Sequence, residues 1–462
     1  MRKRIALLWP YKREKRFPYL PLWALSLGAY LKKKIPDVEI RILDGQIMTS
    51  DMILEEMAEF IPEIVGISLS HEYYKNALIF ARRAKSLGAK VVFGGVFAGV
   101  LGKEILWNRG PRSNDYCVDV IVKGDGERAF FEYIAGKPLN RINNLIYQKG
   151  AGVKENSLKF LDLSRLPAPD RTIIDMRDYF RRQREIKGLQ GSRMTELNVY
   201  FQKGCHWRQK TGGCIFCCRL DSRLRLKSPA IFLEEIRDVV LKYKPGVIKV
   251  DGEDFLGNIK WLIDFSAIYR DFLRRNNRLS VPPRWTILAR ADSINIQTVK
   301  IFKKMNVKRV FIGFESGNDK CLAAARKGVS RLTLKKAAYL LNKCQIEIIG
   351  SFILGLPGET AKTLSETLEL INKISRLDYA RVIQFQFFTP LPGSAAWQMF
   401  LKKTGNKYKD KDLIDWNEAR KDWIKYFCNL SARDIIEAKK ELERLARQQS
   451  RVRFSLIDEI KF

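Results

Sequence analysis

The chain has 462 residues, more than one hydrophobic core usually organises, so two or three domains are expected. Its apolar share of 46% indicates a globular protein, and no run approaches the roughly eighteen apolar residues of a membrane span. The formal net charge of +33 would attract nucleic acid, anionic lipid or phosphorylated substrates, unless the basic side chains are evenly spread and solvated. The basic start has too short an apolar core for a signal peptide, which favours a cytoplasmic, reducing setting.

From Arg4 to Gly136, short β-branched runs alternate with helical patterns. The runs read RIALLWP, EIRILD, IVGISLS, KVVFGG and VDVIVKG, and the helical patterns include LPLWALSLGAYLKKK and YKNALIFARRAKSLG. Five βα units in a row predict an α/β domain over residues 1–137 with a Rossmann-like, doubly wound parallel sheet. Ligands of such sheets bind at the carboxyl ends of the strands, which here are Trp9-Pro10, Ser68–Ser70, Gly94-Gly95 and Gly124–Glu127.

Residues 138–192 are predicted to connect this domain to the next. The segment contains NRINNLIYQ and the turn-rich LDLSRLPAPDRTIID. A basic stretch from Arg177 to Lys187 follows, which could contact an anionic partner or form a solvated helix face.

The stretch NVYFQKGCHWRQKTGGCIFCCRLD, from Asn198 to Asp221, holds four cysteines. Cys205, Cys214 and Cys217 are spaced C-x8-C-x2-C, and Cys218 follows directly. Thiolates this close in an intracellular chain usually hold a metal or an iron–sulfur cluster. Three thiolates would leave one iron of a [4Fe–4S] cluster open, whereas a structural zinc site needs four ligands, with Cys218 or His206 as the fourth. The cysteines that lie singly are predicted to be packing residues: Cys117, Cys321, Cys344 and Cys428.

A second βα series begins after the cysteines. Its strands read VIKVDG, RWTILAR, RVFIGFE, EIIGSFILG and VIQFQFF, with helices between them. Together with the strand before Cys205 they predict six parallel strands over residues 193–399, a partial (β/α)6 TIM-like barrel with its function at the carboxyl ends of the strands. Residues 400–462 are predicted to be a small, basic helical region. Its aromatic residues could line a substrate cavity or bind a nucleic acid, but packing of the helices against the barrel is favoured: Trp416, Trp423, Tyr426 and Phe427.

The cysteine loop resembles that of radical S-adenosylmethionine (SAM) enzymes, in which three cysteines hold a [4Fe–4S] cluster and SAM chelates the fourth iron. The resemblance implies that Cys205, Cys214 and Cys217 are the ligands and that Phe216, just before the third cysteine, lies beside the adenine. The usual spacing is C-x3-C-x2-C, so this loop carries five extra residues.

Motifs at the later strand ends match the same family. VDGED occupies the second-strand position, which implies that Gly252 and Glu253 lie near the SAM amino group. GFESGND matches the fourth strand, where Glu315 and Ser316 would face the SAM ribose or methionine. ILGLPGET, which includes Leu354, matches the turn beside the adenine, and FFTPLPGSAAW resembles the closing segment of the barrel.

The first domain resembles the cobalamin-binding domain that precedes the barrel in one class of these enzymes, through LPLWALSLGAYL, VGISLS, VVFGGVFAG and VDVIVKGDGE. The same glycines suit any βα turn, so a domain of this fold that has lost cobalamin is the alternative. No D-x-H-x-x-G motif occurs, which excludes a histidine ligand to cobalt from the loop after the first strand. The residues that would approach the corrin, or its nucleotide tail, are Ser68, Ser70, Gly94, Gly95, Gly124, Gly126 and Glu127.

The resemblance covers roughly Lys3 to Trp397 and implies a cobalamin-dependent radical SAM enzyme, most simply a methyltransferase acting on an unactivated carbon. Its cofactors would be a [4Fe–4S] cluster, SAM and cobalamin, with an external electron donor of the flavodoxin or ferredoxin type. Oxidative cyclisation, ring contraction and rearrangement are alternatives with the same cofactors. A zinc- or cluster-stabilised RNA-binding protein is an alternative of another class, supported by the charge and the extra cysteine. The substrate, a small molecule, lipid or peptide, is not identified by the sequence.

Overall fold

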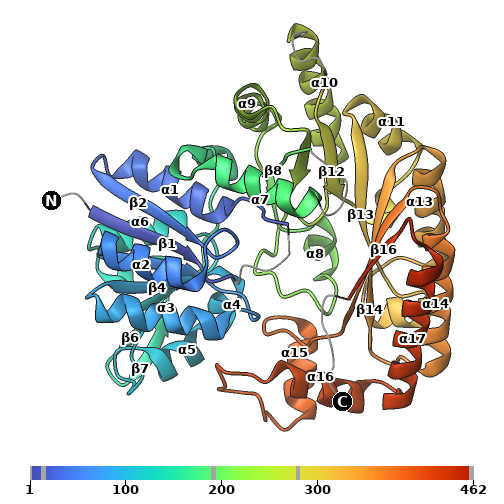
Figure 1. Cartoon of the computed structure of the whole chain (residues 1–462). Coiled ribbons are helices and arrows are strands. Elements are labelled where there is room, and N and C mark those ends of the chain that lie inside the picture. The colour runs from blue at the N-terminus through green and yellow to red at the C-terminus, as the bar shows by residue number, and fades with distance from the viewer. Residues whose placement is uncertain (1–2, 12–16, 189–193, 277–280, 457–462) are drawn as a thin grey trace. The chain divides into compact units, whose positions relative to one another are not determined.

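The computed structural model describes residues 3–11, 17–188, 194–276 and 281–456. The chain divides into two compact units (Figure 1). The first comprises Met1–Asn198 and Asp410–Leu413, and the second comprises Val199–Lys409 and Ile414–Phe462. The domain boundaries expected after residues 137, 192 and 399 stay predictions; residues 189–193 and 457–462 lie outside the described residues.

The first unit contains a seven-stranded sheet in the order β2-β1-β3-β4-β5-β6-β7. The first five strands in this order are mutually parallel, as the sequence predicts, and β6 and β7 are antiparallel. Successive strands are added on one side of β1 (β2) and then on its other side (β3, β4 and β5), so the gap between β1 and β3 is the topological switch point where ligands of such sheets bind. The strands are β1 (Lys3–Trp9), β2 (Val38–Asp44), β3 (Ile64–Ser68), β4 (Lys90–Gly94), β5 (Val120–Val122), β6 (Leu145–Lys149) and β7 (Gly152–Glu155).

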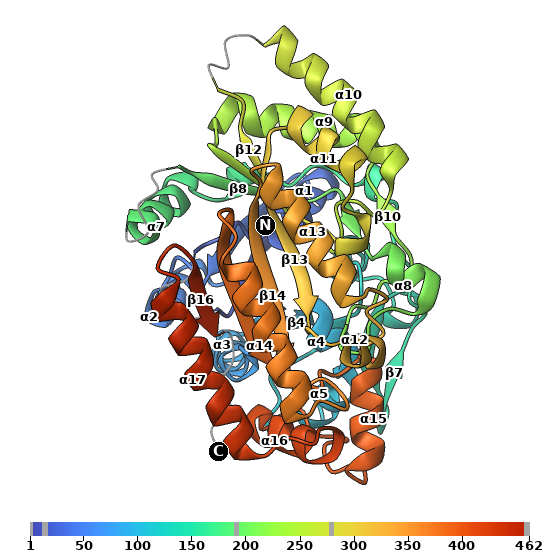
Figure 2. The ribbon, with the colours of Figure 1, turned by 90° about the vertical axis from the view of Figure 1, so that its right-hand side faces the viewer.

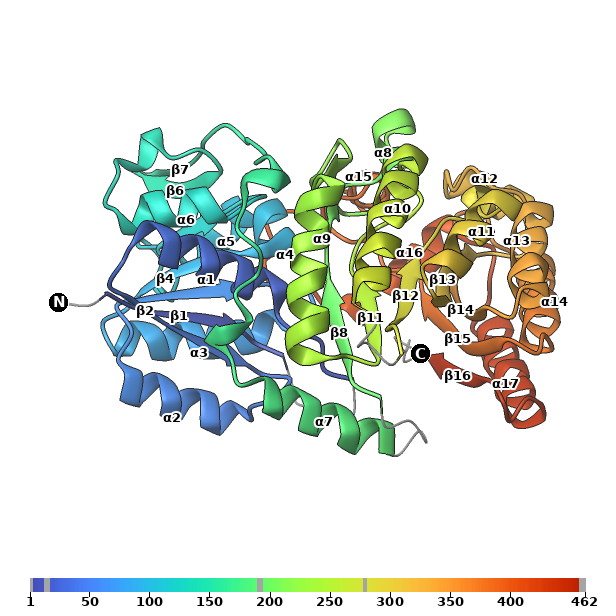
Figure 3. The same ribbon diagram turned by 90° about the horizontal axis from the view of Figure 1, so that it is seen from above.

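Helices cover both faces of this sheet (Figure 3). One face carries α1 (Leu22–Lys34) and α6 (Glu127–Ile134), and the other carries α2 (Ser50–Phe60) and α3 (Tyr74–Ser86). Buried side chains of the strands, α1 and α6 form the core on the first face, which explains the β-branched and apolar runs of the sequence. Three more helices complete the unit: α4 (Gly95–Val100), α5 (Gly102–Arg109) and α7 (Met176–Gly188).

The segment expected to be a connector contributes to this unit. Leu145 and Ile146 of β6 are buried, because the antiparallel strand extends the sheet beyond β5. The sequence pattern does not predict this strand. Ile173 packs against Gly28 of α1, and the Tyr179 hydroxyl donates a 2.6 Å hydrogen bond to the buried Asp44 carboxylate.

The second unit contains a seven-stranded sheet in the order β16-β15-β14-β13-β12-β11-β8. The pairs from β11 to β16 are parallel, and the six predicted strands are confirmed. The seventh strand, β16, lies at the edge and was not predicted, because RFSL is short and follows a long basic helix. The strands are β8 (Glu196–Val199), β11 (Val247–Val250), β12 (Arg284–Leu288), β13 (Val307–Glu315), β14 (Glu347–Leu354), β15 (Ala380–Phe387) and β16 (Arg453–Leu456).

Helices alternate with these strands and pack along one face of the sheet (Figure 2). Each has an apolar stripe toward the strands, as the periodicity predicts. None of the helices in the described part of the chain is long and apolar enough to cross a bilayer. The helices that follow β8 in chain order include α9 (Pro229–Asp238), α10 (Ile259–Arg275), α11 (Ile296–Lys304), α13 (Arg331–Lys343), α14 (Ala361–Ser375), α15 (Ala395–Lys403), α16 (Trp416–Phe427) and α17 (Ala432–Gln448).

Aromatic packing holds two segments of the second unit, the one just before the cysteines and helix α16. Phe201, just before the cysteines, stacks on Trp261 of α10 with ring centroids 4.1 Å apart. Trp423 of α16 is fully buried, stacks on Phe388 and donates a 2.9 Å hydrogen bond from Nε1 to the Gly355 carbonyl. For Trp423 the packing interpretation of the C-terminal aromatic residues is therefore correct.

Candidate functional site

The longer spacing between the first two cysteines of the loop is occupied by a short helix. Cys205 is the residue before α8 (His206–Thr211), and Gly212, with a φ of 83°, ends this helix in the left-handed conformation. Gly204 precedes it with a φ of 84°, and a Cβ there would lie 2.1 Å from the Arg223 carbonyl oxygen. The residues between Cys205 and Cys214 thus form a short helix, and a glycine with positive φ lies on each side of it.

Backbone hydrogen bonds hold the second half of the loop from two sides. The Ile215 N–H donates to the Ala325 carbonyl at 3.1 Å, and the Ile215 carbonyl accepts from the Ala396 N–H at 2.9 Å. Within the loop, the Arg208 guanidinium donates to the Cys217 carbonyl at 3.0 Å. Cys214 and Cys217 flank this fixed point, so their backbone positions are set by distant parts of the same unit.

The thiols of the loop are free and partly exposed, and cations lie beside them. Burial raises the pKa of Cys214 to about 11, and the neighbouring Lys327 and Arg290 oppose this rise. Burial also raises the pKa of Cys205. Iron binding must therefore displace protons, and the two cations would offset the negative charge of the thiolates. Three partly open thiols beside buried cations fit an iron–sulfur cluster.

The His206 ring lies against a buried carboxylate. Its Nδ1 lies 2.8 Å from Oδ2 of Asp254, which is almost fully buried. The other oxygen of Asp254 accepts a hydrogen bond from the Arg290 N–H at 3.2 Å. Within the described ranges, no three His, Cys, Asp or Glu side chains are placed to hold a single metal ion.

Arg290 and Lys327 link the cysteine loop to the ends of β12 and β13. Neither residue is among the site residues that the sequence predicts. The Arg290 guanidinium lies 4.6 Å from the ring of Trp207 in α8 and donates to the Lys327 carbonyl at 2.8 Å. The Lys327 ammonium donates to Oε1 of Glu315 at 2.8 Å, and both side chains are buried. The predicted site residue Glu315 is thereby brought next to Cys214.

The backbone of Glu315 is in the left-handed region, with a φ of 60°. A non-glycine residue there costs about 1–3 kcal/mol and persists only where the surroundings impose it. Gly313 allows this arrangement, because a Cβ at that position would lie 2.2 Å from Oε1 of Glu315 and 2.9 Å from Nζ of Lys327. Strain of this kind at the carboxyl end of a strand is typical of functional sites.

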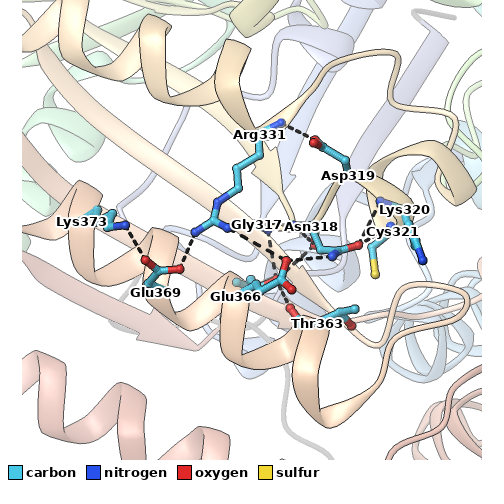
Figure 4. A network of polar contacts seen from close by, with 12 residues as sticks. Gly317, Asn318, Asp319, Lys320, Cys321, Arg331, Thr363, Glu366, Glu369 and Lys373 are labelled. Carbon is cyan, nitrogen blue, oxygen red and sulfur yellow. Dashed lines mark hydrogen bonds and ion pairs between the residues drawn. The ribbon is translucent and has the colours of Figure 1, made fainter.

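Ser316 points toward a helix rather than toward the loop. Its fully buried hydroxyl lies 3.1 Å from that of Thr367 in α14. The Gly317 N–H donates to the same threonine, and Asn318 donates to Glu366 at 2.8 Å, as part of the polar network in Figure 4. This network anchors the end of β13 to α13 and α14. The contact of Ser316 with SAM stays a prediction.

At the end of β11, Glu253 approaches the cysteine loop. Its Oε1 lies 3.3 Å from Nε of Arg219, two residues after Cys217. Burial raises the pKa of Glu253, and Arg219 opposes the rise. The adjacent Gly252 packs against Gln202, since a Cβ there would lie 2.9 Å from Cγ of that side chain. The predicted residues Gly252 and Glu253 thus lie beside the predicted cluster ligands.

The turn after β14 is built around a buried carboxylate that the sequence analysis did not single out. Glu359 is fully buried and accepts a hydrogen bond from the Gly355 N–H. Its other oxygen is shielded from solvent and has no hydrogen-bond partner in the described part of the chain. Burial raises the pKa of Glu359 to about 7. The predicted residue Leu354 is buried immediately before this turn.

In the first unit, the predicted cobalamin residues lie at the carboxyl ends of β3, β4 and β5. Gly95 has a φ of 90°, and a Cβ there would lie 2.8 Å from the Leu69 carbonyl oxygen and 3.2 Å from Oγ of Ser68. The Ser70 hydroxyl is shielded from solvent and has no hydrogen-bond partner among the residues that the structure describes. A shielded hydroxyl without a partner fits a polar ligand group at this edge.

The glycines at the carboxyl ends of β4 and β5 differ in whether their backbone conformation requires glycine. Gly124 has a φ of 78°, and a Cβ there would lie 2.8 Å from Leu158. Gly126 and Gly94 have negative φ values that any residue can adopt. Glu127 is buried as the first residue of α6. Gly95 and Gly124 are thus required by the turns themselves, and the remaining residues stay predictions as cobalamin contacts.

Two family models match the chain in sequence order. Residues 12–134 match the B12 binding domain, and residues 199–371 match the radical SAM superfamily. The uncharacterized methyltransferase PH0819 of Pyrococcus horikoshii is 26% identical over 80% of this chain and 77% of that protein. The anaerobic magnesium-protoporphyrin IX monomethyl ester cyclase of Rubrivivax gelatinosus is 24% identical over 86% of this chain and 68% of that protein.

Solved structures share the fold. The radical SAM methyltransferase TsrM from Kitasatospora setae, solved with cobalamin and a [4Fe–4S] cluster, matches with a TM-score of 0.73, covering 98% of this chain and 91% of that chain at 15% identity. The cobalamin-dependent radical SAM enzyme OxsB matches with a TM-score of 0.66 at 20% identity, and the match covers 81% of this chain but only 52% of that chain. At these identities the likeness shows the fold alone.

Substitution of single cysteines tests the ligand assignment. Cys205→Ala, Cys214→Ala and Cys217→Ala should each abolish the [4Fe–4S] signal, and Cys218→Ala should keep it. The reason is that Cys217 leaves Ile215 and Phe216 between the last two ligands, with the aromatic ring directly before the third. Iron content and electron paramagnetic resonance of the four reconstituted variants provide the measurement. Loss of the cluster in Cys218→Ala with retention in Cys217→Ala would reverse the assignment.

The buried carboxylate of Glu359 should make the stability of the protein depend on pH. The pKa of Glu359 is about 7 in the folded protein and about 4.5 for an exposed glutamate. Between these two pH values folding takes up a proton, so the free energy of unfolding falls as the pH rises from 4.5 through 7. The loss is of the order of 3 kcal/mol. We expect Glu359→Gln to gain stability relative to the wild type across this range, measured by urea unfolding at pH 4.5, 6 and 8.

Glu369 of α14 is the matched control. It is half-exposed, and hydrogen bonds from Lys373 and Arg331 lower its pKa to about 2. Glu369→Gln should therefore show no such gain with rising pH. A Glu359→Gln difference that is the same at all three pH values would disprove the assignment of the titration.

Proposed function

Because the chain belongs to the radical SAM superfamily and carries a B12 binding domain ahead of its radical SAM domain, we propose that this cobalamin-dependent radical SAM enzyme is a methyltransferase acting on an unactivated carbon. One observation carries the proposal. Three partly open thiols lie beside the ends of β11 and β13, in a chain whose other unit is a cobalamin-type sheet. The name of the relative PH0819 supports methyl transfer as the outcome.

The residues of the chain would divide the work as follows. Cys205, Cys214 and Cys217 would hold the cluster, and Lys327 and Arg290 would balance the charge of the thiolates. Gly252 would leave room for SAM, and the carboxylate of Glu253 would accept a hydrogen bond from its ammonium group. When bound, the cluster and SAM supply a 5′-deoxyadenosyl radical that removes hydrogen from the substrate, and methylcobalamin supplies the methyl group.

A second candidate is oxidative cyclisation with the same cofactors, which the cyclase among the relatives favours. The substrate would be a small molecule, a lipid or a peptide. The charge of +33 leaves nucleic acid as a less favoured alternative. Reduction of the cluster would need an external donor of the flavodoxin or ferredoxin type.

Reaction products distinguish the two candidates. The protein is reconstituted anaerobically with iron, sulfide and cobalamin, reduced, and supplied with SAM. A methyltransferase must remethylate cobalt from SAM, so we expect both 5′-deoxyadenosine and S-adenosylhomocysteine in the mass spectrum. The Cys214→Ala variant is the control for the first product. Formation of 5′-deoxyadenosine alone would favour the cyclase class, and the absence of both products would refute the proposal.

The coordination of cobalt gives a further prediction. The loop after β1 contains no histidine, so cob(II)alamin should bind with its benzimidazole tail displaced and without a nitrogen ligand. Its electron paramagnetic resonance spectrum should lack nitrogen superhyperfine coupling. Coupling that persists in His71→Ala would show that the benzimidazole tail remains bound, and coupling that vanishes in that variant would identify His71 as the ligand. Either result would contradict the prediction.

A further inference from the structure

Gln202 lies three residues before Cys205 and is only 3% exposed. Its backbone is fixed, because β9 (Gln202–Lys203) pairs with β10 (Arg225–Leu226) and the neighbouring Phe201 is stacked on Trp261. The point at which the side chain begins is therefore fixed within the second unit.

Neither amide atom of Gln202 has a hydrogen-bond partner in the described part of the chain. Oε1 and Nε2 are both shielded from solvent. Buried polar atoms are almost always paired, since an unpaired one loses its bonds to water without compensation. Methionine would fill the same space without this penalty. The unpaired amide therefore lowers the free energy of unfolding of the ligand-free protein.

The amide lies against Gly252 at the end of β11. A Cβ on Gly252 would come within 3.0 Å of Nε2 and 3.1 Å of Cδ of Gln202. Gly252 itself has no side chain that could satisfy the amide. Gly252 is itself partly exposed and packs against the shielded Nε2, so a ligand that reaches the amide must seat on this glycine.

From this geometry we infer that the Gln202 amide donates a hydrogen bond from Nε2 to the α-carboxylate of bound SAM. The inference rests on the proposed function, in which Gly252 and Glu253 lie near the amino-acid end of SAM. A carboxylate taken out of water requires donors, and Nε2 is a donor to which the described residues offer no partner. Gln202 would thus be a binding residue for the cofactor.

The test compares SAM affinity and ligand-free stability in Gln202→Met and Gln202→Glu. A hydrogen bond to a charged group accounts for about 10-fold or more in affinity, so Gln202→Met should raise the dissociation constant of SAM by at least that factor. Gln202→Glu should raise it further through repulsion between carboxylates. Affinity for 5′-methylthioadenosine, which lacks the amino-acid end, should not change. Equilibrium dialysis against reconstituted protein measures both ligands.

Gln183 is the matched control for stability. It is equally buried, but its Nε2 donates to the carbonyls of Pro18 and Glu196, and its Oε1 accepts from the Glu196 N–H. Gln183→Met should lower the melting temperature of the ligand-free protein, and Gln202→Met should leave it equal or raise it.

Several outcomes would overturn the inference. Unchanged SAM affinity in Gln202→Met would refute it while the proposed function stands. Equal weakening of SAM and 5′-methylthioadenosine, or a loss of iron in the variant, would indicate general distortion of the site and would also refute it. A wild-type protein that holds its cluster but binds no SAM would refute the proposed function and the inference together.

Discussion

The two hydrogen bonds of the Ile215 backbone are the constraint on which the candidate site depends. The cysteine loop has little regular structure apart from α8, so it cannot fix three thiols by itself. Ala325 and Ala396 provide the missing support, one from each side of Ile215. Ala325 caps the end of α12 (Asp319–Ala324) and Ala396 lies in α15, so helices of the second unit carry both anchors. The geometry of the cysteines is thus a product of tertiary structure, although the cysteines themselves are close in sequence.

Most of the fold could be predicted from the sequence, because its strands are short β-branched runs closed by turn residues. The five parallel strands of the first unit and six of the second follow from that pattern. β6 and β16 could not be found in this way. LIYQK begins inside a turn-rich segment, and RFSL is too short to show alternation. Only the neighbouring strands, to which they hydrogen bond, identify them.

The sequence predicts the site residues that belong to short motifs. It does not predict the residues whose role depends on a partner that is distant in sequence. The cysteine spacing and the glycine- and glutamate-containing strand ends mark Cys214, Gly252 and Glu315. Nothing in the local sequence marks Lys327, twelve residues after Glu315, as its buried partner. Gln202 is likewise ordinary in sequence, since its significance lies in the partners that it lacks among the described residues. Absent partners can be recognised only when all neighbours are placed.

The Ile215 anchors also have a consequence for biosynthesis. A ribosome makes Cys205, Cys214 and Cys217 well before it makes Ala325 and Ala396. At about 5–20 residues per second, roughly 10 to 35 s separate the third cysteine from the last anchor. Until then the nascent thiols are tethered but not positioned. Iron delivery by the assembly machinery must therefore follow synthesis of the chain through Ala396, and the exposed thiols must be kept reduced in the interval.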